Sequence, residues 1–302
     1  MPSSPSRRRF LRSTPAAAAA LCLPAPALAI DPPSRAGGPR LRLGLAAYSL
    51  RDHLTGKLSP SMTLDDFIER SAGWGVDAVE LTSYYFPDEI TPAYVAGLKR
   101  HCFLLGLDVS TTPIRNTFTF PAGPARDEQL AHTRKWIDIA ADLGSPAIRI
   151  FAGDAQPGQP EVEARRHCIE TIETCCEHAA RRGVFLALEN HGGIVASPDG
   201  LLEIVKAVDC EWFGVNLDSG NFRTADPYAD VARCAPYAVT AQIKVEMQPN
   251  GGDKVDADLA RVVQILRDAG YRGYATLEYE AKDAPLTAIP RHLDRLRALI
   301  RG

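Results

Sequence analysis

Polar residues able to perform acid–base or metal chemistry follow a short apolar run in the middle of the chain. Residues 186–194 read "LALENHGGI", so the run ends in Glu189, Asn190 and His191 before two glycines. Such a run is typical of a buried strand, whose successive side chains point to opposite faces. Glu189 and His191 therefore share one face, where a carboxylate and an imidazole can bind a metal ion or move a proton.

Four other apolar runs also carry polar residues at or near their ends. Residues two apart in a strand share a face, and the apolar residues next to the polar ones (Leu188, Leu217, Ile243 and Leu277) suit the face that packs against helices. We therefore expect the polar side chains to point into one cavity. They are Arg149, Asn216, Asp218, Gln242, Lys244, Glu246, Glu278 and Glu280.

Three carboxylates that converge in one cavity need positive charge, because they repel each other and lose solvation when buried. A divalent cation supplies that charge most simply to Glu189, Asp218 and Glu278, with Lys244 and Arg149 as assistants. Oxygen ligands suit Mg²⁺ or Mn²⁺, and mixed oxygen and nitrogen ligands extend the choice to Co²⁺ or Zn²⁺.

Each of these residues also has a structural interpretation that the sequence leaves open. Glu189 can be a carboxylate paired with Lys244, and Asp218 can cap the turn "DSGN". His191 can be a loop residue, and Gln242 can fill the barrel with its amide bonded to the backbone. Of the two acids Glu278 and Glu280, one can be solvated.

Eight short β-rich runs alternate with helical patterns at intervals of about 25–40 residues, which suits repeated strand–loop–helix units. Several helical patterns end in Gly, as helix C-termini do. We predict an α/β fold, a single-domain (β/α)8 barrel over 41–302, with a doubly wound open sheet as the alternative. The runs are 41–50, 77–83, 107–112, 147–153, 185–191, 213–221, 239–246 and 274–280, and the main helical patterns are 64–75, 128–144, 163–183, 198–208, 257–270 and 289–302.

The first 29 residues have the composition of an export signal. "SRRRFLR" (6–12) matches the twin-arginine pattern S-R-R-x-F-L-K, an Ala/Leu-rich stretch comes next, and Ala27-Leu28-Ala29 is a small-x-small cleavage site. We predict a twin-arginine signal peptide over 1–29, a Pro/Gly-rich linker over 30–40, and a periplasmic or secreted mature protein.

Composition narrows the partners of the mature chain. Cleavage removes four arginines and no acids, which takes the net charge from −3 to −7, so nucleic acid is a poor partner. No later segment is long and apolar enough to span a membrane. Six cysteines remain, without a metal-type C-x-x-C pair, and we expect free thiols. A homo-oligomer is compatible with the sequence.

Over 41–300 the chain resembles the xylose isomerase-like TIM barrels, the superfamily of sugar isomerases, epimerases and dehydratases. The motifs that carry the resemblance are "LALENHGG", "GVNLDSGNF", "QIKVE" and "GYRGYATLEYE". The chain is most similar to the exported, twin-arginine-tagged branch of sugar phosphate isomerase/epimerase proteins.

The resemblance implies one divalent metal ion, most often Mn²⁺, held by residues at the ends of strands 5 to 8. By position these are Glu189, Asp218, Gln242 and Glu278. Two positions depart from the family pattern, because Gln242 and Asn221 stand where many members carry histidine. An amide oxygen is a weaker ligand than imidazole, so these departures put metal affinity in question. His191 can compensate as a ligand or as a substrate contact.

The chemistry implied by the resemblance is proton abstraction next to a sugar carbonyl, through an enediolate. Glu189 and Glu278 are the expected acid and base, and Lys244 or Arg149 the group that holds the developing oxyanion. Tyr48, Glu80 and Asn116, at or just after the first three strands, are expected sugar contacts.

Two other functions remain open from sequence. A lyase or dehydratase acting on a keto sugar or keto-glycoside would use the same enediolate, and a non-catalytic periplasmic barrel would only bind the sugar. Export favours a free, oxidised or glycosidic sugar over a sugar phosphate, and no dedicated phosphate-binding motif is present.

Overall fold

The computed structural model describes residues 31–302. The predicted signal peptide (1–29) and the first residue of the predicted linker lie outside the described residues, so export stays a prediction.

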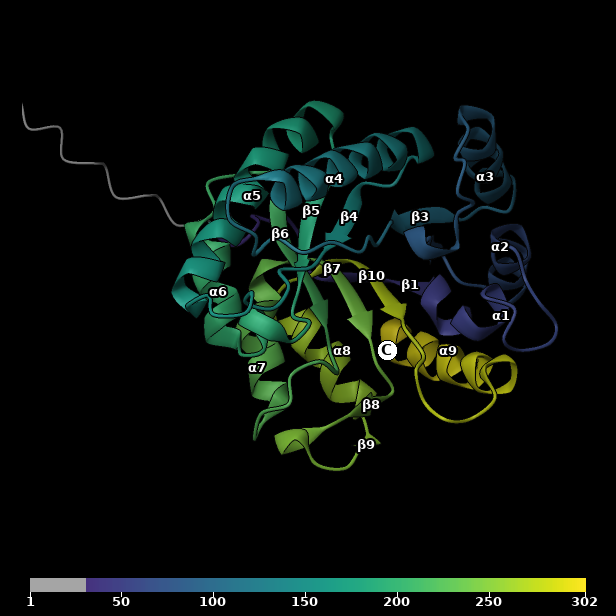
Figure 1. Ribbon diagram of the computed structural model, residues 1–302. Helices are drawn as coiled ribbons and strands as arrows, with labels where there is room; N and C mark the ends of the chain where they lie inside the picture. The colour runs from purple at the N-terminus through teal and green to yellow at the C-terminus, as the bar shows by residue number, and fades with distance from the viewer. Residues whose placement is uncertain (1–30) are drawn as a thin grey trace, which may run out of the picture.

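Eight parallel strands form the centre of the molecule (Figure 1). Their order in the sheet is β3-β2-β1-β10-β7-β6-β5-β4, and backbone hydrogen bonds from Thr112 N to Ala147 O (3.0 Å) and from Ile114 N to Arg149 O (3.0 Å) join the two ends. The sheet is thus a nearly closed barrel, as predicted. The barrel strands are β1 (Arg40–Ala46), β2 (Ala78–Glu80), β3 (Asp108–Thr111), β4 (Ala147–Ile150), β5 (Phe185–Glu189), β6 (Phe213–Asp218), β7 (Ala238–Ile243) and β10 (Arg272–Leu277).

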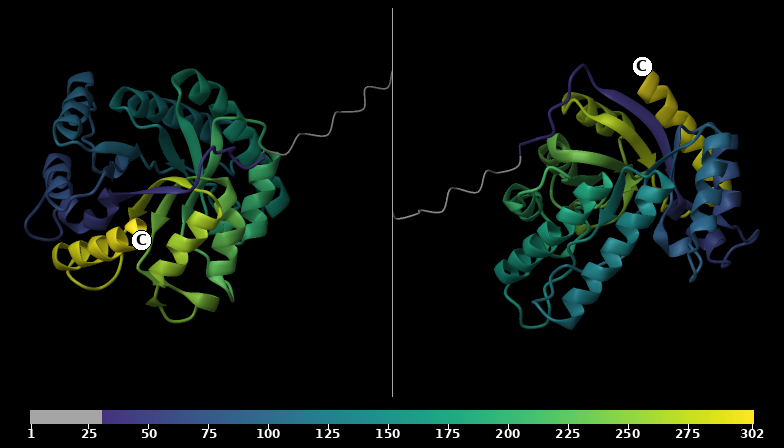
Figure 2. Two further views of the ribbon diagram at one scale, coloured as in Figure 1. Left: turned by 180° about the vertical axis from the view of Figure 1, so that it is seen from behind. Right: turned by 90° about the horizontal axis from the view of Figure 1, so that it is seen from above.

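Helices surround the barrel on its outside (Figure 2). Local sequence explains their limits: Thr63 and Asp66 form a reciprocal capping box at the start of α2, and left-handed Gly144 and Gly183 come directly after the ends of α4 and α5. All six predicted helical patterns are helices. The helices are α1 (Arg51–Leu54), α2 (Leu64–Gly73), α3 (Pro92–Leu104), α4 (Pro124–Leu143), α5 (Glu161–Arg182), α6 (Pro198–Ala207), α7 (Pro227–Cys234), α8 (Leu259–Asp268) and α9 (Pro285–Arg301).

The strand–helix interface is the hydrophobic core. Leu188, Leu217, Ile243 and Leu277 are buried among other apolar residues, as expected for the strand face turned toward the helices. Polar residues therefore occupy the opposite, inner face of the barrel.

A small antiparallel hairpin after β7 was not expected from the sequence. It pairs β8 (Glu246–Met247) with β9 (Val255–Asp256) and lies beyond the carboxyl ends of β7 and β10 (Figure 1). The predicted strand 239–246 thus ends at Ile243. Glu246 belongs to the hairpin, where it pairs with Lys254 at 3.2 Å, and it lines a small pocket together with Lys244 and Glu280.

Two further features concern residues 31–302 as a whole. None of the helices there combines the length and apolarity that crossing a membrane requires. The six cysteines in this range are free thiols, in agreement with the sequence-based expectation.

Candidate active site in the barrel mouth

Buried carboxylates from four strands gather at the carboxyl end of the barrel. Glu80 ends β2, Glu189 ends β5, Asp218 ends β6, and Glu278 comes directly after β10. All four are at most 5% exposed. The carboxyl ends of barrel strands are where TIM barrels build active sites, so this cluster is the candidate site.

Lys244, the residue after β7, lies among three of the carboxylates. Its ammonium nitrogen is 2.5 Å from Glu278 Oε2, 2.5 Å from Glu280 Oε1 and 3.3 Å from Asp218 Oδ2. The contact to Asp218 has the distance of an ion pair but lacks hydrogen-bond geometry. Desolvation lowers the pKa of Lys244, but the three carboxylates outweigh it and hold that pKa well above its ordinary value. Lys244 is therefore buried, and its carboxylate partners favour the charged ammonium form.

Arg149 supplies the second buried cation. Its Nε is 2.7 Å from Glu189 Oε2, an ion pair without hydrogen-bond geometry, and its Nη1 donates to Ile114 O at 2.7 Å. The guanidinium carbon also lies 3.8 Å from the centre of the Phe151 ring. The other Glu189 oxygen accepts from Asn221 Nδ2 at 2.8 Å. Glu189 thus pairs with Arg149, not with Lys244 as the structural interpretation suggested.

Gln242 belongs to a chain of hydrogen bonds inside the barrel. Its Oε1 accepts from Asn216 Nδ2 at 2.7 Å, and its Nε2 donates to Glu80 Oε1 at 2.8 Å. Thr240 Oγ1 donates to Asn216 Oδ1 and completes the chain. The amide of Gln242 is bonded to other side chains at both ends, so its oxygen faces Asn216 and not the cavity that the carboxylates share.

The backbone N–H and C=O groups of Asp218 are both held by hydrogen bonds to the side chain of Asn190. Asn190 Nδ2 donates to Asp218 O, and Asp218 N donates to Asn190 Oδ1, both at 2.9 Å. Asp218 Oδ1 accepts from Gly220 N at 2.8 Å, which is the turn-capping role that its sequence context allowed. Asp218 is therefore both a turn cap and a member of the cluster. The bracing role of Asn190 was missed, although an amide between two polar strand-end residues was visible in the sequence.

Burial raises the pKa of three carboxyl groups of this cluster, those of Glu80, Asp218 and Glu189. Desolvation raises the pKa of Glu80 to about 8, and the negative charge of Glu278 adds to the effect. Desolvation also raises the pKa of Asp218 to about 8 and that of Glu189 to about 7, although Lys244 and Arg149 act in the opposite direction. Two buried oxygens, Glu80 Oε2 and Asp218 Oδ2, have no hydrogen-bond donor. Perturbed carboxyls of this kind are characteristic of active sites.

The arrangement of donor atoms does not fit the divalent metal site expected from Glu189, Asp218, Gln242 and Glu278. The oxygen of Gln242 faces Asn216, both oxygens of Glu189 contact donors, and Lys244 contacts Glu278 and Asp218. Within residues 31–302, no group of three or more acidic, histidine or cysteine side chains has the arrangement that binding a metal ion requires. The buried oxygens that lack a hydrogen-bond donor, Glu80 Oε2 and Asp218 Oδ2, are the feature that would favour a cation.

The remaining predicted contacts separate into rim residues and one structural residue. His191 is exposed at the rim, with its ring 4.4 Å from that of Phe151. Tyr48 is half-buried beside the cluster, and Asn221 binds Glu189. Asn116 differs from expectation: it is buried, its Nδ2 donates to Phe151 O and its Oδ1 accepts from Phe151 N, so its amide braces the backbone of Phe151.

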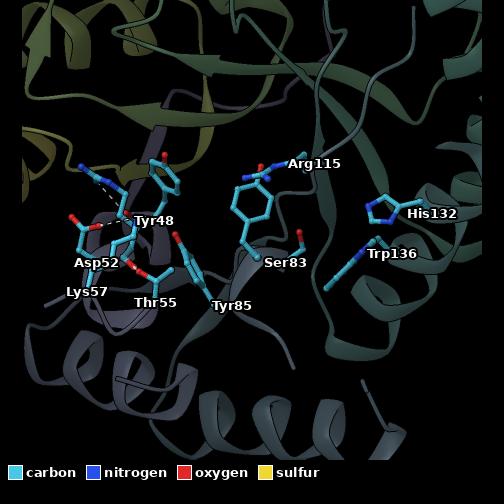
Figure 3. Close-up of a pocket in the computed structure, with 11 residues that line it drawn as sticks. Tyr48, Asp52, Thr55, Lys57, Ser83, Tyr85, Arg115, His132 and Trp136 are labelled. Atoms are coloured by element: carbon cyan, nitrogen blue, oxygen red, sulfur yellow. Dashed lines mark hydrogen bonds and ion pairs between the residues drawn. The ribbon is translucent and has the colours of Figure 1, made fainter. Parts of the chain in front are cut away.

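A groove of about 630 Å³ lies beside the cluster (Figure 3). Figure 3 shows Tyr48 and Asp52 toward one end and His132 and Trp136 toward the other. Tyr84 connects the groove to the site, since its hydroxyl lies 3.5 Å from Arg149 Nη2. The groove is lined by Tyr48, Arg51, Asp52, Thr55, Lys57, Ser83, Tyr84, Tyr85, Arg115, His132 and Trp136.

A much smaller pocket, of about 70 Å³, reaches the cluster itself and is lined in part by Asn221, Lys244 and Glu280. The carboxylates are therefore closely packed around their cations, whereas the larger groove has room for a sugar ring.

Solved structures of similar fold include sugar epimerases. A D-psicose 3-epimerase from Clostridium cellulolyticum H10, solved with D-tagatose, has a TM-score of 0.70 at 14% identity and covers 86% of this chain and 99% of its own. A 3-keto-D-glucoside 4-epimerase from E. coli has a TM-score of 0.68 at 14% identity and covers 86% and 100%. At these identities the likeness shows the fold alone.

A third structure of similar fold contains a metal. The IolI protein, solved with a zinc atom, has a TM-score of 0.69 at 15% identity and covers 86% of this chain and 96% of its own. No curated protein matches the chain.

The sequence also matches a family model. The xylose isomerase-like TIM barrel model matches residues 68–299, from α2 to α9. The match includes every barrel strand except β1, and it contains all four carboxylates of the cluster. The chain therefore belongs to the xylose isomerase-like TIM barrel family.

Proposed function

We propose that the protein is a sugar isomerase or epimerase that moves a proton on the carbon next to a sugar carbonyl. The observation that supports this most strongly is the pair of buried carboxylates Glu189 and Glu278, each beside its own cation, Arg149 and Lys244. They come from β5 and β10, which β6 and β7 separate in the sheet, so they can approach a substrate carbon from different sides. The epimerases of similar fold agree with this class of reaction.

Glu189 is the proposed base. Its ionised carboxylate removes the proton from the carbon next to the carbonyl, and the electron pair of that C–H bond moves onto the carbonyl oxygen. A pKa raised to about 7 makes the carboxylate a stronger base than an exposed glutamate, while leaving it partly ionised at neutral pH. For epimerisation Glu278 enters the reaction protonated; it gives its proton to the other face of the carbon and is left ionised beside Lys244. For isomerisation Glu189 gives the proton it removed to the neighbouring carbon, while the hydroxyl proton of the substrate moves to the former carbonyl oxygen.

Lys244 and Arg149 are proposed to stabilise the negative charge that develops on the substrate oxygen. Both cations are fixed by their carboxylate partners before substrate binds, and buried charges act more strongly than solvated ones. The sequence-based expectation of Mn²⁺, Mg²⁺, Co²⁺ or Zn²⁺ is not supported by the donor arrangement. The proposal therefore routes no step through a metal ion.

The groove beside the cluster suits a carbohydrate. The aromatic side chains of Tyr48, Tyr84, Tyr85 and Trp136 offer apolar faces for the C–H face of a sugar ring, and the polar groups between them can bond its hydroxyls. Because Tyr48 lies in both the groove and the surroundings of Glu278 and Glu280, a sugar bound there adjoins the cluster.

A non-catalytic sugar-binding barrel is the second candidate, and one observation favours it. The pocket that Lys244 lines within residues 31–302 has a volume of about 70 Å³, so catalysis requires the side chains of the cluster to rearrange when a sugar binds.

Exchange of a substrate proton with solvent separates the two candidates. The purified protein is incubated in D₂O with aldoses, 2-ketoses and 3-keto-glycosides, and deuterium incorporation is followed by NMR. The protein is expected to label one class of sugar, and Glu189→Gln and Glu278→Gln each to lower the rate by about 100-fold or more. Glu177→Gln, an exposed carboxylate on α5, is the matched control and should keep the full rate.

Binding of a sugar without exchange would identify the binding barrel. Exchange that persists in both Glu189→Gln and Glu278→Gln would contradict the proposed roles.

A further inference from the structure

Lys244 has the surroundings of a built cation site. Its ammonium group carries three N–H donors, and three carboxylates surround it: Glu278 and Glu280 at 2.5 Å and Asp218 at 3.3 Å. Lys244 is 8% exposed, so the ammonium is nearly removed from water. Such a group is stable only if its partners replace the lost hydration. Here Glu278 and Glu280 do so through hydrogen bonds, and Asp218 adds an ion pair.

The neighbouring backbone fixes the path of the lysine side chain. Ser219 Oγ accepts from Lys244 N at 2.9 Å, which anchors the backbone where β7 ends. A Cβ atom on Gly220 would lie 2.7 Å from both Cβ and Cγ of Lys244. The absence of a side chain at Gly220 therefore leaves the space through which the lysine stem reaches the carboxylates.

Lys244 and a divalent ion would compete for the same carboxylates. An ion bound by Asp218 and Glu278 would lie within a few ångströms of the ammonium, and two buried cations at that distance repel strongly. Gln242 also argues against a bound divalent ion, because its oxygen accepts a hydrogen bond from Asn216 and does not point at those carboxylates. The positive charge that the cluster needs is already part of the chain.

We propose that the ammonium group of Lys244 takes, in this protein, the place that a divalent metal ion would hold among Asp218, Glu278 and Glu280, so that the site works without a metal. The inference deepens the proposed function, but metal binding tests it without reference to activity.

The test is the affinity for divalent ions of the protein and of variants that lack the ammonium. Chelator-treated protein is titrated with Mn²⁺ and with Zn²⁺ by calorimetry, and bound metal is counted by elemental analysis. The unaltered protein is expected to take up no stoichiometric metal. Lys244→Met keeps the length of the stem but removes the charge, which leaves the carboxylates unpaired, so it should bind Mn²⁺ about 100-fold more tightly or better.

Two variants serve as controls. Lys254→Met removes an exposed lysine next to a single carboxylate, Glu246, and should gain no affinity. Lys244→Arg keeps the positive charge and should also gain none; it remains informative if Lys244→Met fails to fold.

One equivalent of Mn²⁺ or Zn²⁺ bound to the unaltered protein, and lost in Asp218→Asn, would overturn the proposal. Metal gained equally by Lys244→Arg would overturn it as well. If the proposed function fails while this inference holds, the protein will bind no metal and will also not exchange any sugar proton with solvent.

Discussion

Glu189 and Glu278 differ in the cation that each contacts, and this difference sets their environments. Glu189 is held between Arg149 and Asn221, whereas Glu278 shares Lys244 with Glu280 and Asp218. The sequence showed which strand ends carry carboxylates, because an acidic residue directly after an apolar run can be recognised from the order of residues alone. It did not show which cation meets which acid, because that depends on the rotamers of long side chains from separate strands.

Gln242 is the residue for which the sequence-based prediction and the structure differ most. Its position matched a metal ligand of the family, but its amide bridges Asn216 and Glu80. Glutamine can donate and accept at once, and buried polar atoms nearly all find partners. The amide of Asn216 and the carboxyl of Glu80 therefore determine how the side chain of Gln242 is oriented. Neither neighbour could be identified from the spacing of residues in the sequence.

The raised pKa of Glu80 predicts a pH-dependent stability. In the folded state this carboxyl keeps its proton up to about pH 8, whereas in the unfolded chain it loses it near its ordinary value of 4.5. Between these values the folded state binds more protons, so the free energy of unfolding falls as pH rises, by up to about 1.4 kcal/mol per pH unit for this group. Glu80→Gln removes this contribution and should flatten the fall between pH 5 and 8.

Urea unfolding at several pH values measures this effect. Asp218 and Glu189 keep their own contributions, so Glu80→Gln should reduce the slope but not remove it. The exposed-residue variant Glu177→Gln should keep the slope of the unaltered protein. An equal slope in Glu80→Gln would show that Glu80 is ionised in the folded state.

At the scale of elements, the barrel strands were easier to predict than the segments between them. The eight barrel strands carry short apolar runs of regular spacing, and each one lies where its run predicted. The β8–β9 hairpin was missed because each of its strands has two residues, too few for an alternating pattern to appear. Helices α3 and α7 were not among the patterns singled out, although Thr91 and Asp226 cap them with their side chains.

The junction between β6 and β7 gives a prediction on packing. Gly220→Ala would place a Cβ 2.7 Å from the stem of Lys244 and 2.9 Å from the backbone oxygen of Glu246, so it should lower the free energy of unfolding by about 1–3 kcal/mol. It should also slow solvent exchange, because it displaces the ammonium.

Gly97→Ala is the matched control for this substitution. Gly97 lies in α3, is exposed, and has no atom within 4 Å of an added Cβ, so alanine there should stabilise the protein by about 0.5–1 kcal/mol. Thermal or urea unfolding compares the two variants. A Gly220→Ala protein as stable as the unaltered one would show that the lysine stem can move aside at little cost.

At the scale of the whole molecule, barrel and cluster depend on each other. Parallel strands bring their carboxyl ends to one end of the barrel, so carboxylates from β2, β5, β6 and β10 become neighbours although they are far apart in the chain. This convergence was predictable once the strands were counted. The groove of Figure 3 was not predictable from the sequence. Its lining comes from loops and helices, and no periodic pattern of residues shows how these lie relative to one another.

Export is the whole-molecule prediction that rests on sequence alone. The segment Ser6–Arg12 matches the twin-arginine pattern, so the paired substitution of Arg7 and Arg8 by lysine should retain the uncleaved protein in the cytoplasm. Cell fractionation with an antibody against the barrel measures this. A periplasmic yield unchanged by the double substitution would contradict export by this pathway.

The most direct test of the central claim is deuterium incorporation from D₂O into a sugar by chelator-treated protein, with EDTA present throughout. If buried carboxylates and buried side-chain cations perform the reaction, exchange continues at the full rate in EDTA and falls by about 100-fold or more in Glu189→Gln. Exchange that stops in EDTA and returns with added Mn²⁺ would contradict the metal-free site, and the absence of exchange with every class of sugar would contradict the enzyme itself.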